Sequence, residues 1–213
     1  RSKRLTAILS ARGGRIGTGK VHLLAQSEST NDDAKAAAKH DNAPHGSIWI
    51  AESQSKGRGR QGRSWISPVG ENLLFSVLLR IPQVAIGRVP PLSLAVGLVV
   101  RNAIGKALGV DADDDVLVKW PNDVLIRGKK VAGILIESGL SGSKVEYLVV
   151  GIGVNVHTRS FPDEIASIAT SVALESSASA SASASASASA SAPLPPDRAE
   201  ILADILAGLD HDI

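Results

Sequence analysis

A loop rich in arginine and glycine is the first segment whose residues could do chemistry. Residues 57–65 read GRGRQGRSW, with three arginines and three glycines around a single glutamine. Guanidinium groups match the oxygens of phosphates and carboxylates, and glycine lets backbone N–H groups approach an anion closely. The loop is therefore a candidate anion-binding site. The same composition also suits a nucleic-acid contact or a loop that faces solvent.

A second polar segment, KWPND at residues 119–123, follows a predicted strand. Pro121 ends strand pairing there and places Asn122 and Asp123 in a loop beside the sheet edge. A cation, an indole and two polar groups suit a nucleotide contact. A strand-ending turn that carries a surface lysine is the alternative.

Lys130 stands at the start of an alternating apolar strand. A period of two places it on one face of that strand together with Ala132, Ile134 and Ile136. At the strand edge, Lys130 is either a cation directed into a site or a surface lysine whose stem covers apolar neighbours.

Two glycines mark one face of a later strand. With a period of two, Gly151, Gly153 and Asn155 share that face. Glycine weakens a strand, so we expect a ligand or a closely packed neighbouring element to lie against it. Asn155 could offer its amide oxygen to Mg²⁺, but asparagine alone specifies no metal.

Composition limits the class of protein. The chain has 213 residues, 44% of them hydrophobic, which is enough for one sizeable domain. A net charge of only +2 argues against a dedicated nucleic-acid binder and makes the arginine loop a local feature. The absence of cysteine rules out disulfides and thiolate sites, and it suits a reducing cytoplasm. The apolar stretch at residues 91–100 is too short to span a membrane, and no signal peptide is expected.

Periodicity predicts an α+β fold with a mixed, largely antiparallel sheet packed with helices, because adjacent strands form hairpins without regular alternation with helices. We expect a hydroxyl-capped helix after Ser29, a buried helix at 91–108 and a final helix opened by a capping box at Asp197. The expected strands cover residues 47–52, 72–79, 116–120, 124–126, 131–137 and 145–156. A Ser-Ala tract at about residues 176–192 has no large side chain to bury and predicts a disordered loop.

Taken together and in this order, the polar segments resemble the biotin–protein ligase family. Each motif alone is weak evidence, but five motifs in the same order are specific. The resemblance runs from about residue 27 to about residue 171. The matching segments are residues 29–31, Gln54 with residues 57–65, residues 119–123, residues 130–133 and residues 151–155. The resemblance implies a single catalytic domain over residues 1–213, similar to the class II aminoacyl-tRNA synthetase-like domain of biotin and lipoate ligases.

The resemblance also implies a reaction and a role for each matching residue. Biotin and MgATP would give biotinyl-5′-AMP, over which the arginine loop closes, and biotin would then pass to a lysine of a biotin carboxyl carrier domain. The implied catalytic residues are Lys130 and Arg60. The implied biotin-binding residues are Ser29, Thr30, Asn31, Gln54, Arg58, Gly59, Arg60 and Lys130. The implied ATP-binding residues are Arg63, Trp65, Lys119, Asn122 and Asn155, with Asn155 and Asp123 near the magnesium.

The chain departs from the family at both ends. It begins at Arg1 and contains no methionine, so we expect a fragment or a processed form. About two dozen residues precede the first motif, which is too few for the DNA-binding domain of many bacterial relatives, so we expect no DNA partner and no membrane partner. The small C-terminal β domain of the family is expected to be absent or truncated. A lipoate–protein ligase and a nucleic-acid-binding module that uses the arginine loop are the rival interpretations.

Overall fold

One seven-stranded sheet organises the chain. The computed structural model describes residues 16, 20–81, 87, 89–141, 144–177 and 196–213. The strands lie side by side in the order β1-β2-β3-β7-β6-β5-β4, and β1–β2 is the parallel pair while the other neighbours are antiparallel. The α+β fold with a mixed, largely antiparallel sheet is thus confirmed. The strands are β1 (Val21–Leu24), β2 (Ile48–Ala51), β3 (Leu73–Leu79), β4 (Val116–Lys119), β5 (Asp123–Ile126), β6 (Lys129–Ser141) and β7 (Lys144–Val154).

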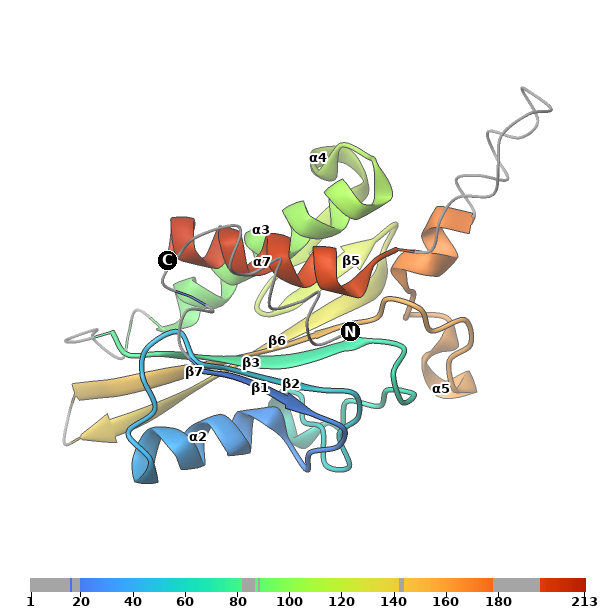
Figure 1. The fold of residues 1–213 in the computed structure, drawn as a ribbon. Coiled ribbons are helices and arrows are strands. Elements are labelled where there is room, and N and C mark those ends of the chain that lie inside the picture. The colour runs from blue at the N-terminus through green and yellow to red at the C-terminus, as the bar shows by residue number, and fades with distance from the viewer. Residues whose placement is uncertain (1–15, 17–19, 82–86, 88, 142–143, 178–195) are drawn as a thin grey trace.

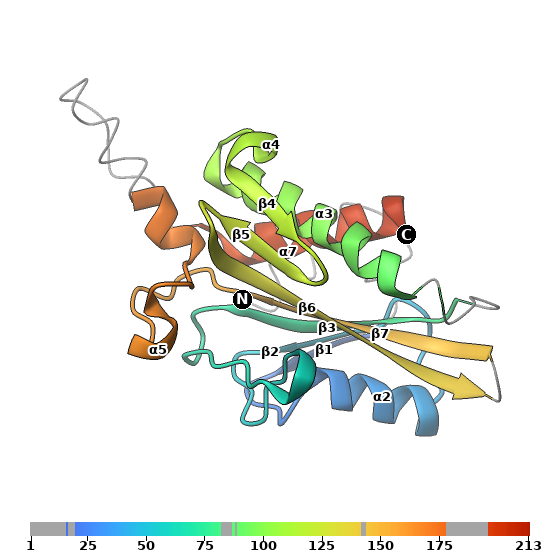
Figure 2. The same ribbon diagram turned by 180° about the vertical axis from the view of Figure 1, so that it is seen from behind.

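Helices cover both faces of this sheet. Helix α2 (Thr30–His40) lies on one face, whereas α3 (Val89–Leu108) and α7 (Arg198–Asp212) lie on the other (Figure 1), as the reverse view also shows (Figure 2). Two short helices, α4 (Ala112–Asp115) and α5 (Asp163–Ala166), complete the connections. Covering on both faces explains why β3 is buried along its whole length, since a strand between two layers has no solvent face.

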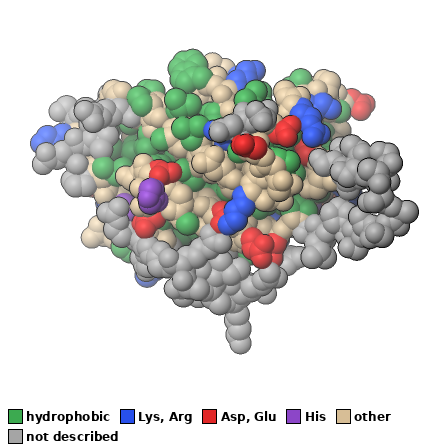
Figure 3. All heavy atoms as spheres, turned by 90° about the horizontal axis from the view of Figure 1, so that it is seen from above, with side chains coloured by type: hydrophobic (Ala, Val, Ile, Leu, Met, Phe, Trp, Pro, Cys, Tyr) green, Lys and Arg blue, Asp and Glu red, His purple; other side chains and the backbone are tan. Residues whose placement is uncertain are grey.

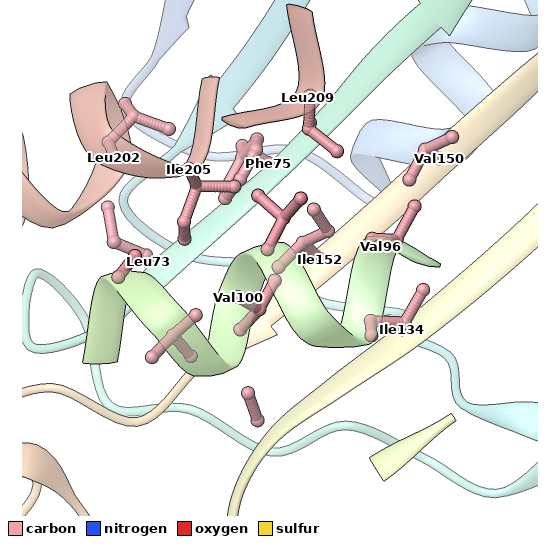
Figure 4. Packing of buried hydrophobic residues seen from close by; sticks show 14 of the residues in the cluster. Leu73, Phe75, Val96, Val100, Ile134, Val150, Ile152, Leu202, Ile205 and Leu209 are labelled. Carbon is pink, nitrogen blue, oxygen red and sulfur yellow. The ribbon is translucent and has the colours of Figure 1, made fainter. Parts of the chain in front are cut away.

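Alternation along the central strands divides the core into two clusters. Val150 and Ile152 of β7 belong to the larger cluster under α3 and α7, and Val149 belongs to the smaller cluster under α2. Figure 4 shows side chains of α3 and α7, such as Val100 and Ile205, among those of the sheet strands. The outer surface of this helical layer mixes hydrophobic, basic and acidic side chains (Figure 3).

Helix α3 is long and apolar enough to cross a membrane by length and composition, and no other described helix is. Seven of its residues are buried, among them Val96, Val100 and Ile104, which pack in the main core. Leu94 and Leu98 are exposed, as are the polar residues Asn102 and Lys106, so the helix expected to be largely buried also has a solvent-facing side. This arrangement is typical of the core helix of a folded domain.

Local sequence signals explain several element ends. Arg127 and Gly128 both have positive φ, 48° and 81°, which is the two-residue turn expected between β5 and β6. Asp197 caps α7 as expected, because its Oδ1 accepts a hydrogen bond of 2.8 Å from the N–H of Ala199. Strand β1 was not expected, since a four-residue segment carries little periodic signal. Most of the Ser-Ala tract lies outside the described residues.

Candidate active site

A cavity of about 510 Å³ opens on the sheet where the arginine loop, the start of α2 and the β4–β5 connection meet. The cavity gathers every predicted site residue except Asn155. The lining residues that the sequence predicted are Ser29, Thr30, Asn31, Gln54, Arg58, Gly59, Arg60, Arg63, Trp65, Lys119, Asn122, Asp123 and Lys130. Segments more than a hundred residues apart in the chain thus form one site.

The lining is strongly cationic. Five of its side chains are arginine or lysine, and Asp123 is its one carboxylate. The guanidinium of Arg60 makes no ion pair or hydrogen bond with any residue that the structure describes, and the residue is exposed at the loop tip. Such a cavity favours an anionic ligand, because cations that converge on one volume repel each other and an anion that enters relieves this repulsion.

The arginine loop folds as a small hairpin between β2 and β3. Trp65 N–H donates to Gly57 O, and Gly59 N–H donates to Arg63 O at 2.7 Å. Between these two pairs, Arg58 and Ser64 form an antiparallel β-bridge. A 3₁₀ turn, η1 (Arg60–Gly62), forms the tip. The loop is therefore a positioned element whose backbone directs Arg58 and Arg60 toward the cavity.

Neutral polar groups line the cavity at the start of α2. Gln54 Oε1 accepts from Thr30 N–H at 2.7 Å and lies 3.0 Å from Thr30 Oγ1. The predicted hydroxyl cap at Ser29 is wrong, because its side chain makes no capping bond and Gln54 satisfies the first helical N–H instead. Ser29 is buried and faces the cavity. Ser76 Oγ, 2.6 Å from Asn31 Oδ1, buttresses this end from β3.

The glycine face of the sheet is the floor of the cavity. A Cβ at Gly151 would overlap the Asn31 side chain, and a Cβ at Gly153 would lie 2.6 Å from Trp65 Cε2. At Gly133 of the neighbouring strand β6, a Cβ would lie 2.8 Å from the same indole. The elements that pack against the glycines are therefore two side chains of the site itself. Trp65 Nε1 is buried and makes no hydrogen bond with a described residue.

Lys130 lies on a different face of β6 from the one predicted. Val124 pairs with Ala132 and Leu125 pairs with Lys130, so a β-bulge inserts Val131 as an extra residue. The bulge turns Lys130 away from the core, where Ala132 lies, and toward Gly133 and the cavity. A strict period of two does not apply across such an insertion.

The ammonium of Lys130 pairs with the single carboxylate of the cavity. Its Nζ lies 2.6 Å from Asp123 Oδ1 and 5.4 Å from the centre of the Trp65 ring. The carboxylate oxygen is buried and accepts no well-aligned hydrogen bond, so the contact with Lys130 is an ion pair by proximity. Asn122, the neighbour of Asp123, donates from Nδ2 to Ile134 O at 3.1 Å and thereby ties the β4–β5 connection to β6.

Asn155 does not line the cavity. Its side chain is buried and donates from Nδ2 to Thr170 O at 3.1 Å. Among the residues that the structure describes, no group of three or more His, Cys, Asp or Glu side chains could hold a metal ion. Asp123 is thus the one carboxylate at the cavity that could contact a cation.

Three residues that the sequence did not single out surround the start of α2. They are Asp32, Lys35 and Glu137: Lys35 forms ion pairs with both carboxylates, and so does Arg58. Burial alone would raise the pKa of Asp32, but hydrogen bonds and the charges of Lys35 and Arg58 outweigh burial and lower it. Burial would lower the pKa of Lys35, but its carboxylate partners raise it. Asp32 lies in the first turn of α2, where acidic residues are common, so its type alone gives no sign of a partner in the arginine loop.

The fold and the site define a class of protein. The model of the biotin/lipoate A/B protein ligase family matches residues 23–155, and the chain belongs to that family. A bifunctional ligase/repressor BirA of Bacillus spizizenii is 40% identical over 159 residues, 73% of this chain and 47% of that protein. A biotin–[acetyl-CoA-carboxylase] ligase of Paracoccus denitrificans is 44% identical over 135 residues, 63% of this chain and 53% of that protein. The chain thus spans about half the length of these relatives.

Solved structures agree with this assignment. Biotin protein ligase from Aquifex aeolicus in complex with biotin and ATP superposes with a TM-score of 0.70 at 31% identity, over 91% of this chain and 69% of that chain. The Leishmania major enzyme in complex with biotinyl-5-AMP gives a TM-score of 0.68 at 29% identity, over 90% of this chain and 74% of that chain. The fold resemblance predicted from the sequence is confirmed.

Proposed function

We propose that this chain is a biotin–protein ligase that activates biotin with MgATP to biotinyl-5′-AMP and transfers biotin to a lysine of a biotin carboxyl carrier domain. The observation that carries the proposal is the polarity of one cavity. Neutral hydrogen-bonding groups meet at the start of α2, where Gln54 bonds to Thr30 beside Ser29, and five cations line the same cavity. Biotin has the same polarity, with a neutral ureido ring at one end and a carboxylate at the other.

The first chemical step joins two anions. A carboxylate oxygen of biotin attacks the α-phosphorus of ATP, and the bond to pyrophosphate breaks. Lys130 and Arg60 lower the repulsion between carboxylate and phosphate, and they stabilise the negative charge that builds up in the transition state. The pairing of Lys130 with Asp123 keeps its ammonium in the cavity before substrates bind.

The remaining residues bind and orient. Ser29, Thr30, Asn31 and Gln54 face the ureido ring, whereas Arg58 and Gly59 hold the carboxylate end. Arg63, Trp65, Lys119 and Asn122 contact ATP, and the indole of Trp65 lies on the glycine floor at Gly133 and Gly153. In the second step, the amine of the carrier lysine attacks the carbonyl carbon of the anhydride and AMP leaves. A closed arginine loop would keep water from the anhydride until then.

Magnesium fits this site only if most of its ligands come from the phosphates of ATP and few come from the protein. Mg²⁺ is commonly bound by one or two carboxylates together with substrate phosphates and water. Asp123 meets this requirement, whereas Asn155 lies outside the cavity lining and would need to be reoriented. Bound magnesium would neutralise phosphate charge.

The proposal makes the cytoplasm the site of action and includes neither DNA nor a membrane as partner. The test is incubation of the chain with biotin, ATP and a separately purified carrier domain, followed by mass measurement of the carrier. A mass increase of one biotin that requires ATP supports the proposal. Calorimetric titration with biotin and with lipoate separates the two acids, and binding of lipoate without biotin would overturn the choice of substrate.

A further inference from the structure

Glu137 has three partners beside the cavity but does not line it. The residue lies on β6, and its carboxylate accepts from Asn31 Nδ2 at 2.8 Å, from Lys35 Nζ at 2.7 Å and from Arg58 at 3.2 Å. Two of these partners, Asn31 and Arg58, line the cavity, and both donate to the same oxygen of Glu137, Oε2, so they lie side by side in the cavity wall. None of the roles proposed above uses this carboxylate.

For Asn31, the carboxylate fixes which way the amide points. A carboxylate can only accept hydrogen bonds, so the Nδ2 atom must face Glu137, while Oδ1 lies 2.6 Å from the Ser76 hydroxyl. Nδ2 also donates to Leu135 O at 3.3 Å. The side chain lies directly against Gly151, where even a Cβ would not fit. Without Glu137, this buried amide would lose its charged acceptor and the constraint on its orientation.

For Arg58, the carboxylate closes a ring of alternating charges. Arg58 pairs with Asp32 at 2.7 Å, Asp32 with Lys35 at 2.8 Å, Lys35 with Glu137, and Glu137 with Arg58. The ring joins three elements, the arginine loop, α2 and β6. Each cation has two carboxylates and each carboxylate has two cations, so removal of one member leaves two others with a single partner.

We infer that Glu137 is a positioning residue that couples the start of α2 to the arginine loop by holding Asn31 and Arg58 at the same time. This inference rests on the proposed function, because it concerns how biotin is held. Glu137 touches neither substrate in this arrangement. Its effect on biotin passes through two residues that line the cavity, Asn31 and Arg58.

The test uses Glu137→Ala and Glu137→Gln in the full chain. Pyrophosphate release is measured at varied biotin and at varied ATP, with biotin affinity by calorimetry and a melting curve for each variant. Loss of a charged partner beside a buried amide should raise Kd and KM for biotin about tenfold in Glu137→Ala. The KM for ATP and kcat should stay within about twofold, because none of the three partners of Glu137 is assigned to ATP.

Glu137→Gln keeps an acceptor for Asn31 but removes the charge that holds Arg58 and Lys35. The KM of this variant for biotin should therefore lie between those of the parent and Glu137→Ala. Because glutamine has nearly the same shape as glutamate, this variant should still fold if Glu137→Ala does not. Glu146→Gln, an exposed change on β7, is the matched control and should behave as the parent.

A purely structural role predicts a different pattern, with a lower melting temperature and with biotin and ATP affected equally or not at all. Either that pattern or a Glu137→Ala variant with the biotin KM of the parent overturns the inference. If the parent chain neither binds biotin nor releases pyrophosphate, the proposed function itself fails and this inference falls with it.

Discussion

The indole of Trp65 packs on Gly153 so closely that a Cβ at residue 153 would lie 2.6 Å from Cε2 of the ring. Real Cβ atoms do not approach other atoms this closely, so one of the two residues would have to move. Trp65 comes from the arginine loop and Gly153 from β7 at the centre of the sheet. The arginine loop can therefore place Trp65 against the sheet only because residue 153 is glycine.

Gly153→Ala should displace the indole and weaken ligand binding. Overpacking at such a contact costs roughly 1–3 kcal/mol. Because the cost falls on the position of Trp65, we expect biotin and ATP affinity to fall together, with a smaller effect on melting temperature. Gly87→Ala is the control, since a Cβ there meets nothing within 4 Å. Unchanged affinity for both ligands in Gly153→Ala would mean that the indole does not shape the site.

Lys130→Ala should slow adenylate formation by a factor of about 10²–10³, the usual effect of removing one group that stabilises transition-state charge. Lys129→Ala, an exposed change one residue away, is the control and should react at the parent rate. Single-turnover pyrophosphate release measures both. A Lys130→Ala variant with the parent rate would return this residue to the class of surface lysines.

The same substitution leaves the buried Oδ1 atom of Asp123 without its cation. We therefore expect Lys130→Ala to lower the melting temperature, and Lys130→Ala combined with Asp123→Asn to restore part of it. The adenylate rate should remain low in the double variant. This separates the contribution of Lys130 to folding from its contribution to chemistry.

The elements of the site could be read from the sequence because each motif lies next to a strand end or a helix start. The strand that carries Gly151 and Gly153 was predicted with its glycine face, and the structure confirms that something packs against it. The orientation of Lys130 was not predictable, because the β-bulge at Val131 appears only in the pairing of β6 with β5.

Contacts between distant segments were also beyond the sequence. Gln54 replaces Ser29 as the cap of α2 because the loop after β2 returns to the helix start, which no local pattern indicates. Glu137 lies 79 residues from Arg58 and meets it only because β6 passes beneath the loop. A carboxylate at the end of an apolar strand gives no sign of such a partner.

The charge ring around α2 should depend on pH through Asp32. Its pKa is lowered from the ordinary value of 3.8 in the folded chain, so the stability that its ionised form provides is present above pH 3.8. This stability is lost as the pH falls through the lowered pKa of the folded state. The melting temperature of Asp32→Asn should therefore lie below that of the parent at neutral pH, and the difference should shrink on acidification below pH 3.8.

Glu164→Gln, an exposed change on α5, is the control for this titration and should follow the parent at every pH. Because the ring is partly exposed, added salt should reduce the difference at neutral pH. A gap between parent and Asp32→Asn that stays constant into strong acid would show that the ionised carboxylate does not support the fold.

Arg60→Gly should loosen the hold on the activated intermediate more than the hold on biotin. The guanidinium of Arg60 lines the cavity from the loop tip and has no partner among the described residues, so it is available for a ligand anion. It gains most from the phosphate of the adenylate, because charge-assisted hydrogen bonds to an anion are stronger than neutral ones. Without it, biotinyl-5′-AMP should leave before transfer and react with lysines of unrelated proteins.

The measurement for Arg60→Gly is labelling of a bystander protein, such as albumin, in the presence of the carrier domain. Arg159→Gly, an exposed change remote in sequence, is the control. Labelling confined to the carrier at the parent rate would show that Arg60 does not retain the intermediate.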